Sequence, residues 1–186
     1  MPVPLRPVNR AVSIIKLGRP LFLGGGFILY ALGAAIAAAT GHPISPVRYA
    51  LGQGAVTAFQ LMTHYANDYF DYEADRANLT PTKWSGGSRV LSEGELPRHV
   101  ALVAAVVLAV IGFACATALG GSTLVVATLV AIFVLAWEYS APPLRLCASG
   151  LGELDTAIVV TVLVPWVAFS LQAPDLVGLH TLAHSV

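Results

Sequence analysis

The chain has 186 residues, of which 56% are hydrophobic and only 11% are charged, and its formal net charge is zero. Soluble domains usually carry about 25% charged residues, and the mean hydropathy here is +0.75. These values exclude a disordered chain, a collagen-like chain and an ordinary soluble domain, because too little polar surface is present to cover a globule. A neutral chain also has no basic field for nucleic acid, so the composition predicts a membrane protein with no nucleic-acid partner.

Apolar stretches predict a chain that crosses a membrane several times. Five stretches are long enough to span about 30 Å of hydrocarbon as helices: 21–39, 47–66, 99–119, 122–139 and 154–171. The Gly120-Gly121 pair predicts a tight reversal that makes the third and fourth helices antiparallel neighbours, and Pro165 predicts a kink in the fifth. We therefore expect an all-α, multi-pass transmembrane helix bundle of about five spans, with residues 1–186 forming a single membrane domain.

The basic residues predict how this bundle is oriented. Nine of the ten Lys and Arg residues fall on one side of the expected spans, and only Arg48 falls on the other. The positive-inside rule makes the nine-residue side cytoplasmic. We therefore expect a cytoplasmic N-terminus in a bacterial-type inner membrane, with segments 67–98 and 138–153 as cytoplasmic loops and any site built from them on the cytoplasmic side.

The end of the second span carries the most informative polar pattern. At about 100° per residue, five polar side chains fall within an arc of about 80° if the helix continues: Gln60, His64, Asp68, Asp71 and Asp75. An aspartate at mid-bilayer costs roughly 2.5–3.5 kcal/mol, so these acids must lie near the interface, face a wet cavity or neutralise a cation. Oxygen ligands without cysteine suit Mg²⁺ better than Zn²⁺.

Simpler interpretations of this stripe remain open. A solvated acidic loop after a helix would carry the same charges, and His64 alone would more commonly be a hydrogen-bonded structural group. A site is favoured because Gln60 and His64 are also polar, lie inside the span and share the acidic face. A cation or proton carrier that uses the stripe as a relay is a further alternative.

Two later segments could bind an anion at the same membrane face. Segment 80–89 combines Gly and Ser with two cations, Lys83 and Arg89, although a plain linker would explain it equally well. In segment 137–146, Arg145 lies on the side of the acidic stripe, and Tyr139 has the position of an interfacial aromatic. A metal with nearby cations suggests a substrate with a diphosphate head at the cytoplasmic mouth and an apolar tail between the helices.

The pattern Asn67-Asp68-x-x-Asp71-x-x-x-Asp75 resembles the first aspartate-rich motif of the UbiA-type intramembrane prenyltransferases. Supporting matches occur at 19–20 (RP), 85–91 (SGGSRVL), 139–143 (YSAPP) and 150–153 (GLGE). The sequences NDYFDY and YSAPPLR look closest to the menaquinone branch of the family. Members of that branch prenylate 1,4-dihydroxy-2-naphthoate with loss of CO₂.

The resemblance implies part of a nominal nine-helix bundle with a central cavity. It implies Mg²⁺-dependent transfer of a polyprenyl group from an isoprenyl diphosphate to an aromatic acceptor in quinone biosynthesis. By this implication Asn67, Asp68 and Asp71 would hold Mg²⁺ against the diphosphate. Asp75 would complete the catalytic motif or assist the acceptor.

The resemblance also implies roles for the cations and aromatic residues near the motif. Lys83, Arg89 and Arg145 would contact the diphosphate and stabilise it as it leaves. Aromatic side chains would stabilise the allylic cation before the acceptor attacks it, and the candidates are Tyr69, Tyr139 and Phe70.

One part of the family pattern is missing from the sequence. The five expected spans correspond to the first ~60% of that pattern, and the later acids do not form its second aspartate motif: Glu138, Glu153, Asp155 and Asp175. A fragment or interrupted reading frame, a partner chain that supplies the missing helices, and a non-catalytic remnant would each explain this. A structural or assembly subunit without chemistry therefore stays an alternative function.

Overall fold

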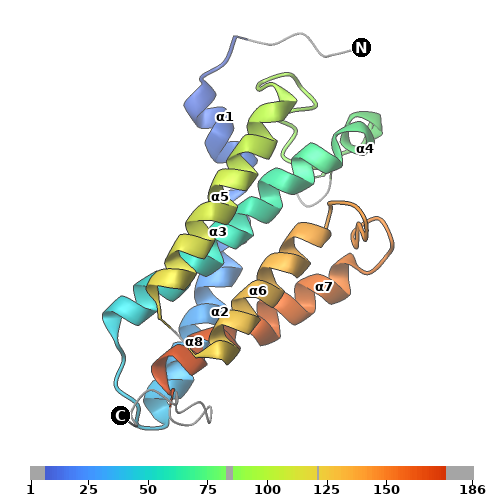
Figure 1. The fold of residues 1–186 in the computed structure, drawn as a ribbon. Coiled ribbons are helices and arrows are strands. Elements are labelled where there is room, and N and C mark those ends of the chain that lie inside the picture. The colour runs from blue at the N-terminus through green and yellow to red at the C-terminus, as the bar shows by residue number, and fades with distance from the viewer. Residues whose placement is uncertain (1–6, 83–85, 121, 175–186) are drawn as a thin grey trace.

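The computed structural model describes residues 7–82, 86–120 and 122–174, and within these ranges every regular element is helical. The all-α prediction is therefore confirmed. In chain order the elements are α1 (Arg10–Leu17), α2 (Pro20–Ala39), α3 (Pro46–Phe70), α4 (Tyr72–Ala77), α5 (Arg98–Ala118), α6 (Thr123–Glu138), α7 (Gly152–Ile158), the π-helical segment η1 (Val159–Leu163) and α8 (Val164–Gln172) (Figure 1).

The five predicted apolar stretches all fall on helices. Among the described residues, three helices are long and apolar enough to cross a membrane: α2, α5 and Gly152–Gln172, which joins α7, η1 and α8. With 25 residues, α3 is long enough but carries more polar side chains, whereas α6 is apolar but has only 16 residues. Length and composition therefore support an integral membrane protein.

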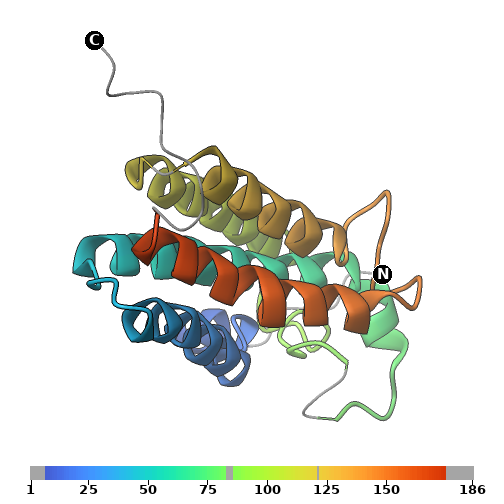
Figure 2. The same cartoon turned by 90° about the horizontal axis from the view of Figure 1, so that it is seen from below.

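The bundle is built around α3, which packs against α2, α5, α6 and α8. Figure 2 shows the segment that runs from α7 to α8 lying between α2 and α6. Large buried side chains of α3 fill the centre of the core, among them Phe59 and Met62. This arrangement places α3 in contact with α2, α5, α6 and α8, so its polar end lies near the segments that connect these helices.

Glycines allow the helices to approach one another closely. A Cβ atom on Gly33 of α2 would lie 2.0 Å from the carbonyl oxygen of Pro165, so the backbones of α2 and α8 are in direct contact there. Gly52 of α3 lies beneath the hydroxyl of Tyr30, and Gly112 of α5 lies against the ring of Phe59. Small residues are the usual means of helix packing in membranes, because lipid supplies no hydrophobic force between apolar helices.

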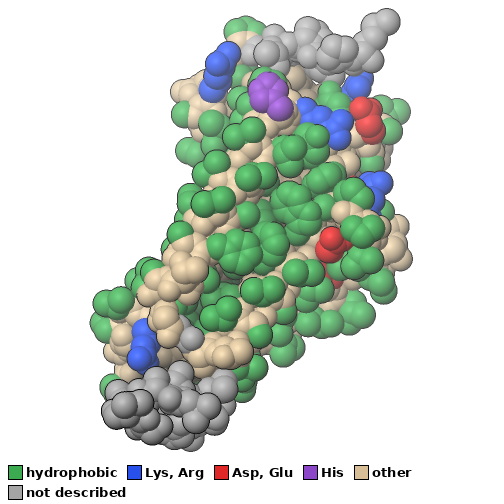
Figure 3. Space-filling view, viewed as in Figure 1, with side chains coloured by type: hydrophobic (Ala, Val, Ile, Leu, Met, Phe, Trp, Pro, Cys, Tyr) green, Lys and Arg blue, Asp and Glu red, His purple; other side chains and the backbone are tan. Residues whose placement is uncertain are grey.

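The outer surface of the bundle is apolar. On α5 the exposed side chains are large and the buried ones small: Val103, Val106, Val107 and Val110 are exposed, and Ala101, Ala105, Gly112 and Ala116 are buried. On the face in Figure 3, apolar side chains cover the middle, and most charged side chains lie toward the end that carries α1 and α4. This pattern suits a helix surface that faces lipid, with its charged end at the interface.

α5 and α6 run antiparallel and are in contact, as predicted, although the contact between them is small (Figure 1). The two helices touch through Phe113 and Phe133, whose ring centroids are 4.7 Å apart, but each packs more extensively against α3. Phe59 of α3 lies against both rings, at 5.3 and 5.6 Å. Phe59, Phe113 and Phe133 therefore form one aromatic cluster that joins α3, α5 and α6.

The distortion expected at Pro165 is present as a π-helical turn. η1 ends at Leu163, two residues before this proline. Proline has no amide hydrogen and its ring crowds the preceding turn, and a π-helical turn is one way for a long helix to absorb that conflict.

A short helix before the first span was not predicted from the apolar pattern. α1 begins at Asn9, whose side chain accepts a hydrogen bond from the amide of Ala11 at 3.1 Å. It ends at Gly18, and Arg19 then adopts a left-handed conformation with φ of 47°. α2 starts at Pro20, a residue that suits the first position of a helix because no amide donor is needed there. The break between α1 and α2 places Arg19 next to the end of α3.

The contact between Gly33 and Pro165 predicts a large difference between two similar substitutions. Gly33→Ala should lower the free energy of unfolding by about 1–3 kcal/mol, because the new methyl group would overlap backbone atoms of α8. Gly24→Ala on the same helix is the matched control, since nothing lies within 4 Å of its Cβ position, and it should be neutral or stabilise by up to about 1 kcal/mol. Reversible unfolding in detergent would measure both values, and equal stability of the two variants would contradict the proposed packing.

Candidate functional site

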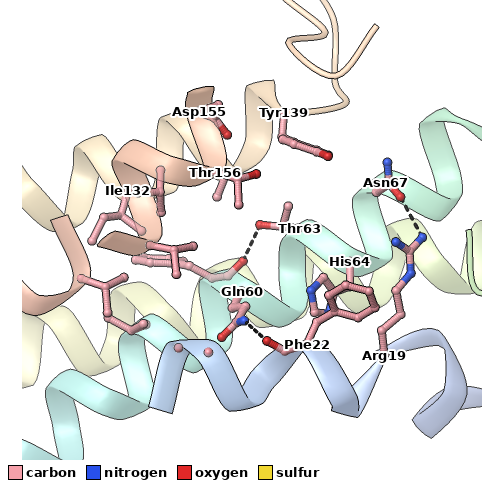
Figure 4. A pocket seen from close by; sticks show the side chains of 18 residues that line it. Arg19, Phe22, Gln60, Thr63, His64, Asn67, Ile132, Tyr139, Asp155 and Thr156 are labelled. Atoms are coloured by element: carbon pink, nitrogen blue, oxygen red, sulfur yellow. Dashed lines mark hydrogen bonds between the residues drawn. The ribbon is translucent and has the colours of Figure 1, made fainter. Parts of the chain in front are cut away.

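A cavity of about 350 Å³ lies between α2, α3, α6 and the segment that contains α7 and η1. Most of its wall is apolar, with Val56, Phe59 and Ile132 among the lining side chains. Polar side chains are found at one end, where Arg19 and Asn67 lie close together, and along the two facing walls (Figure 4). The cavity therefore has an apolar interior and a charged mouth.

Asp68 is the most deeply buried acid of the predicted stripe, with 2% of its surface exposed. It forms an ion pair with the guanidinium group of Arg19. It also accepts hydrogen bonds from the hydroxyl of Ser88 and from the amide of Ser88, the latter at 3.2 Å. The negative charge of Asp68 is thus neutralised by a side chain from the α1–α2 break and by the loop before α5.

Asn67 joins three separate segments at the mouth. Its side-chain oxygen accepts a hydrogen bond from Arg19 Nη2 at 2.7 Å. Its Nδ2 atom donates to Asp71 Oδ2 at 2.5 Å and to Ser140 Oγ at 2.8 Å. Segments 67–98 and 138–153 therefore meet at one end of the bundle.

Asp71 ends α3 and faces the loop between α6 and α7. Arg145 Nη2 lies 3.4 Å from Asp71 Oδ1, and the thiol of Cys147 donates to Asp71 Oδ2 at 3.5 Å. Burial raises the pKa of the Cys147 thiol, and the nearby charge of Asp71 raises it further. Cys147 is therefore held as a neutral thiol that can donate to the carboxylate.

The acidic stripe does not lie on one unbroken helix. α3 ends at Phe70 and α4 begins at Tyr72, although the amide of Asp75 still donates to the carbonyl of Asp71 at 2.8 Å. The Asp75 carboxyl lies against Gly87, where a Cβ atom would be 2.0 Å from Oδ2. Burial raises the pKa of Asp75 to about 6, and the charges of Asp68 and Asp71 raise it as well.

The two polar residues inside the second span hold α2 against α3. His64 Nδ1 is 2.7 Å from the carbonyl oxygen of Gly18, and Gln60 Nε2 donates to the carbonyl of Phe22 at 2.8 Å. Both side chains also line the cavity. The hydrogen bond of His64 therefore agrees with the simpler interpretation of this residue as a hydrogen-bonded structural group.

The predicted cation and aromatic residues are divided between the mouth and other sites. Arg145 is at the mouth, whereas Arg89 Nη1 donates to the backbone carbonyl of Asp75 at 2.5 Å. Lys83 lies outside the described residues. The part each would play toward a diphosphate stays a prediction.

Tyr139 lines the cavity, and its ring packs against Gly152, where a Cβ atom would lie 3.3 Å from Cε2. Burial raises the pKa of the Tyr139 hydroxyl. Tyr69 lies elsewhere: its ring is stacked beneath Arg98, with the guanidinium carbon 4.5 Å from the ring centroid, and it is not among the residues that line the cavity.

The arrangement at the mouth does not fit a metal centre as it stands. Within the described ranges, no group of three or more His, Cys, Asp or Glu side chains could hold a metal ion. The predicted ligands Asn67, Asp68 and Asp71 offer oxygen atoms of the right chemical kind. However, Arg19 and Ser88 already occupy the carboxylate of Asp68.

Several residues of the mouth belong to sequence motifs for which the sequence predicts no role. Arg19, Ser88 and Ser140 belong to the segments quoted for the family resemblance, and each contacts Asn67 or Asp68. Those segments were the available signal, because residues far apart in the sequence cannot be paired by spacing alone. Asp155 was set aside since it does not form a second motif with Glu153, yet it lines the cavity.

The fold and the site together define a multi-pass membrane protein with a cavity between its helices and a charged mouth at one end. A model of the UbiA prenyltransferase family matches residues 27–185, and the chain belongs to that family. No curated protein and no solved structure matches the chain. The sequence predicted a resemblance to only the first ~60% of the family pattern, and the matched span does not agree with that prediction. The match also does not identify the menaquinone branch.

The pairing of Arg19 with Asp68 predicts strong coupling between the two side chains. Arg19→Gln should lower the free energy of unfolding by about 3 kcal/mol, because it leaves a buried carboxylate without its counter-charge. Adding Asp68→Asn should recover part of that loss. Arg76→Gln is the control, since it removes an exposed pair with Glu73 and should change stability by less than about 1 kcal/mol. Unfolding in mixed micelles would measure the cycle, and additive effects of the two substitutions would contradict the coupling.

The raised pKa of Asp75 predicts a pH dependence of stability. Its folded-state pKa is about 6 against an ordinary value of 3.8, so the folded protein holds a proton that the unfolded chain releases between these values. The resulting stabilisation is complete below 3.8 and is lost as the pH rises through about 6. Unfolding measured across this window should show the full loss in the natural protein and in Glu73→Gln, and a smaller loss in Asp75→Asn. The same slope in all three would contradict the assignment.

Proposed function

We propose that the protein transfers a polyprenyl group from an isoprenyl diphosphate to an aromatic acceptor in quinone biosynthesis of the menaquinone type. Family membership supports prenyl transfer in general. The observation that carries the proposal for this chain is the cavity, whose apolar walls end at a mouth lined by Arg19, Asn67 and Tyr139. An isoprenyl diphosphate has the same division, with an anionic head and an apolar tail.

The cations at the mouth support a site for the diphosphate head. Arg19 lines the cavity, and Arg145 has 47% of its side chain exposed, so its guanidinium group has donors free to meet an anion. Guanidinium groups bind phosphate oxygens well because they present several donors in a fixed plane. Arg89 and Lys83 remain candidates for further contacts on the strength of the sequence.

A requirement for Mg²⁺ is part of the proposal and rests on two supports. UbiA-family enzymes in general use a divalent metal, and Asn67, Asp68 and Asp71 carry the oxygen atoms that Mg²⁺ prefers. A bound divalent ion would neutralise charge on the leaving diphosphate. Because Arg19 pairs with Asp68 in the described arrangement, we assign no step of the transfer to the metal.

Tyr139, the aromatic residue at the mouth, is suited to stabilising the prenyl cation. Breaking the bond between the prenyl carbon and the diphosphate oxygen leaves an allylic cation, which an aromatic face stabilises. Tyr139 lines the cavity beside the charged groups and is our candidate for this role. Tyr69 lies on α3 with its ring under Arg98 and away from the cavity wall, so its role stays a prediction from the sequence.

The orientation and the assembly of the protein are also proposals. We place the mouth on the cytoplasmic side, because nine of the ten basic residues flank the spans at that end. A non-catalytic subunit, or a half-bundle completed by a partner chain, is the alternative. A proton or cation carrier has less support, because Gln60 and His64 bind backbone carbonyls and not each other.

Binding of farnesyl diphosphate to the purified protein tests the proposed function. Asp68→Ala should abolish binding, because it removes the charge that holds Arg19 and Ser88 in place. Arg145→Gln should weaken binding about tenfold, since one charge-assisted hydrogen bond is lost. Glu73→Gln is the control, because that side chain is 73% exposed and pairs only with Arg76 across the described residues.

Each outcome of this experiment has a definite meaning. Unchanged affinity in both Asp68→Ala and Arg145→Gln would contradict the assignment of the mouth to the diphosphate. Transfer to 1,4-dihydroxy-2-naphthoate, followed by mass spectrometry with and without Mg²⁺, then separates the enzyme from the non-catalytic alternative. Tight binding without any product would favour the latter.

A further inference from the structure

A second buried carboxyl group lies in the cavity wall, and the mouth does not use it. Asp155 of α7 is 7% exposed, and its Oδ1 atom is enclosed with no hydrogen-bond partner among the described residues. Its backbone amide is occupied, because it donates to the carbonyl of Leu151 at 2.9 Å. Figure 4 shows Asp155 and Thr156 on the wall that faces Gln60 and His64 across the cavity.

The contrast with Asp68 makes this carboxyl group informative. Asp68 is also buried, but it accepts hydrogen bonds from Arg19 and from both the amide and the hydroxyl of Ser88. A buried carboxyl group without a donor is costly, because it loses its hydration and gains nothing in return. A ligand that enters the cavity would offset this free-energy cost if it donated a hydrogen bond to the Asp155 carboxylate.

The chemistry of a carboxylate restricts what that ligand can be. A carboxylate only accepts hydrogen bonds and carries negative charge. It would repel a diphosphate, and a prenyl tail has no donor to offer. Among the reactants of the proposed transfer, this leaves the aromatic acceptor, provided that it carries hydroxyl groups.

The surroundings of Asp155 suit a hydroxylated aromatic ring. The ring of Tyr139 packs on Gly152, three residues before Asp155, so an aromatic face lies one turn away along the same wall. Thr156 adds a hydroxyl group to the same wall of the cavity. We propose that Asp155 is a specificity-determining residue of the acceptor site, and this proposal rests on the proposed function. The Asp155 carboxylate accepts a hydrogen bond from a hydroxyl group of the acceptor.

A pair of matched probes tests this proposal directly. 1,4-Dihydroxynaphthalene and 1,4-dimethoxynaphthalene share one ring system, and only the first can donate hydrogen bonds. Equilibrium binding to the purified protein in detergent should favour the dihydroxy compound about ten- to hundredfold, the range expected for a hydrogen bond to a charged group. Asp155→Leu should reduce this preference to within about threefold.

Two further variants keep the result interpretable. Asp155→Asn preserves the size of the side chain and removes its charge, so the preference should fall by about tenfold even if Asp155→Leu fails to fold. Glu153→Gln changes an exposed carboxylate two residues earlier and should keep the full preference. A preference that persists in both Asp155 variants, or that is absent from the natural protein, would overturn the proposal. So would a lowered melting temperature in Asp155→Asn with an unchanged preference, which is the result expected of a purely structural residue.

The proposal and the proposed function fail in different ways. Farnesyl diphosphate binding is measured on the same preparations, and the exposed control Glu153→Gln should leave it unaffected. If that binding is present and the preference for the dihydroxy probe does not depend on Asp155, only the acceptor assignment is wrong. If the natural protein binds no farnesyl diphosphate, the proposed function is wrong, whatever the naphthalene probes do.

Discussion

The ion pair between Asp68 and Arg19 is the constraint on which the charged end of the bundle depends. A carboxylate that is 2% exposed at the end of an apolar helix needs a counter-charge. Arg19 supplies it from a left-handed position between α1 and α2, and this fixes where α2 begins. The amide and the hydroxyl of Ser88 also donate hydrogen bonds to the Asp68 carboxylate, so the loop before α5 is held to the same group.

The rest of the mouth follows from this pair through Asn67. Because Asn67 accepts from Arg19 and donates to Asp71 and Ser140, one amide side chain connects the α1–α2 break, the end of α3 and the loop after α6. The connections explain why α3 occupies the centre of the fold. Because α3 packs against α2, α5, α6 and α8, its polar end lies within reach of three connecting segments.

The sequence was informative about elements and much less so about partners. Apolar length predicted the helices, and the stripe from Gln60 to Asp75 correctly marked the polar end of α3. The pairing of Arg19 with Asp68 joins residues 49 positions apart, and no periodicity encodes it. The three-ring cluster of Phe59, Phe113 and Phe133 could not be predicted either, because it joins side chains from three helices that are far apart in the sequence.

The two buried acids, Asp68 and Asp155, differ in their hydrogen-bond partners. Asp68 forms an ion pair with Arg19 of the same chain, so this interaction stabilises the fold whether or not a ligand is present. Asp155 has no such partner within the described residues, so its hydrogen bonding depends on what enters the cavity. A donor-bearing ring held at Asp155 would lie beside Tyr139, next to the end where Arg19 and Arg145 attract an anion. Under the proposed function, the anion and the donor-bearing ring would therefore lie close together near the mouth, as a transfer between them requires.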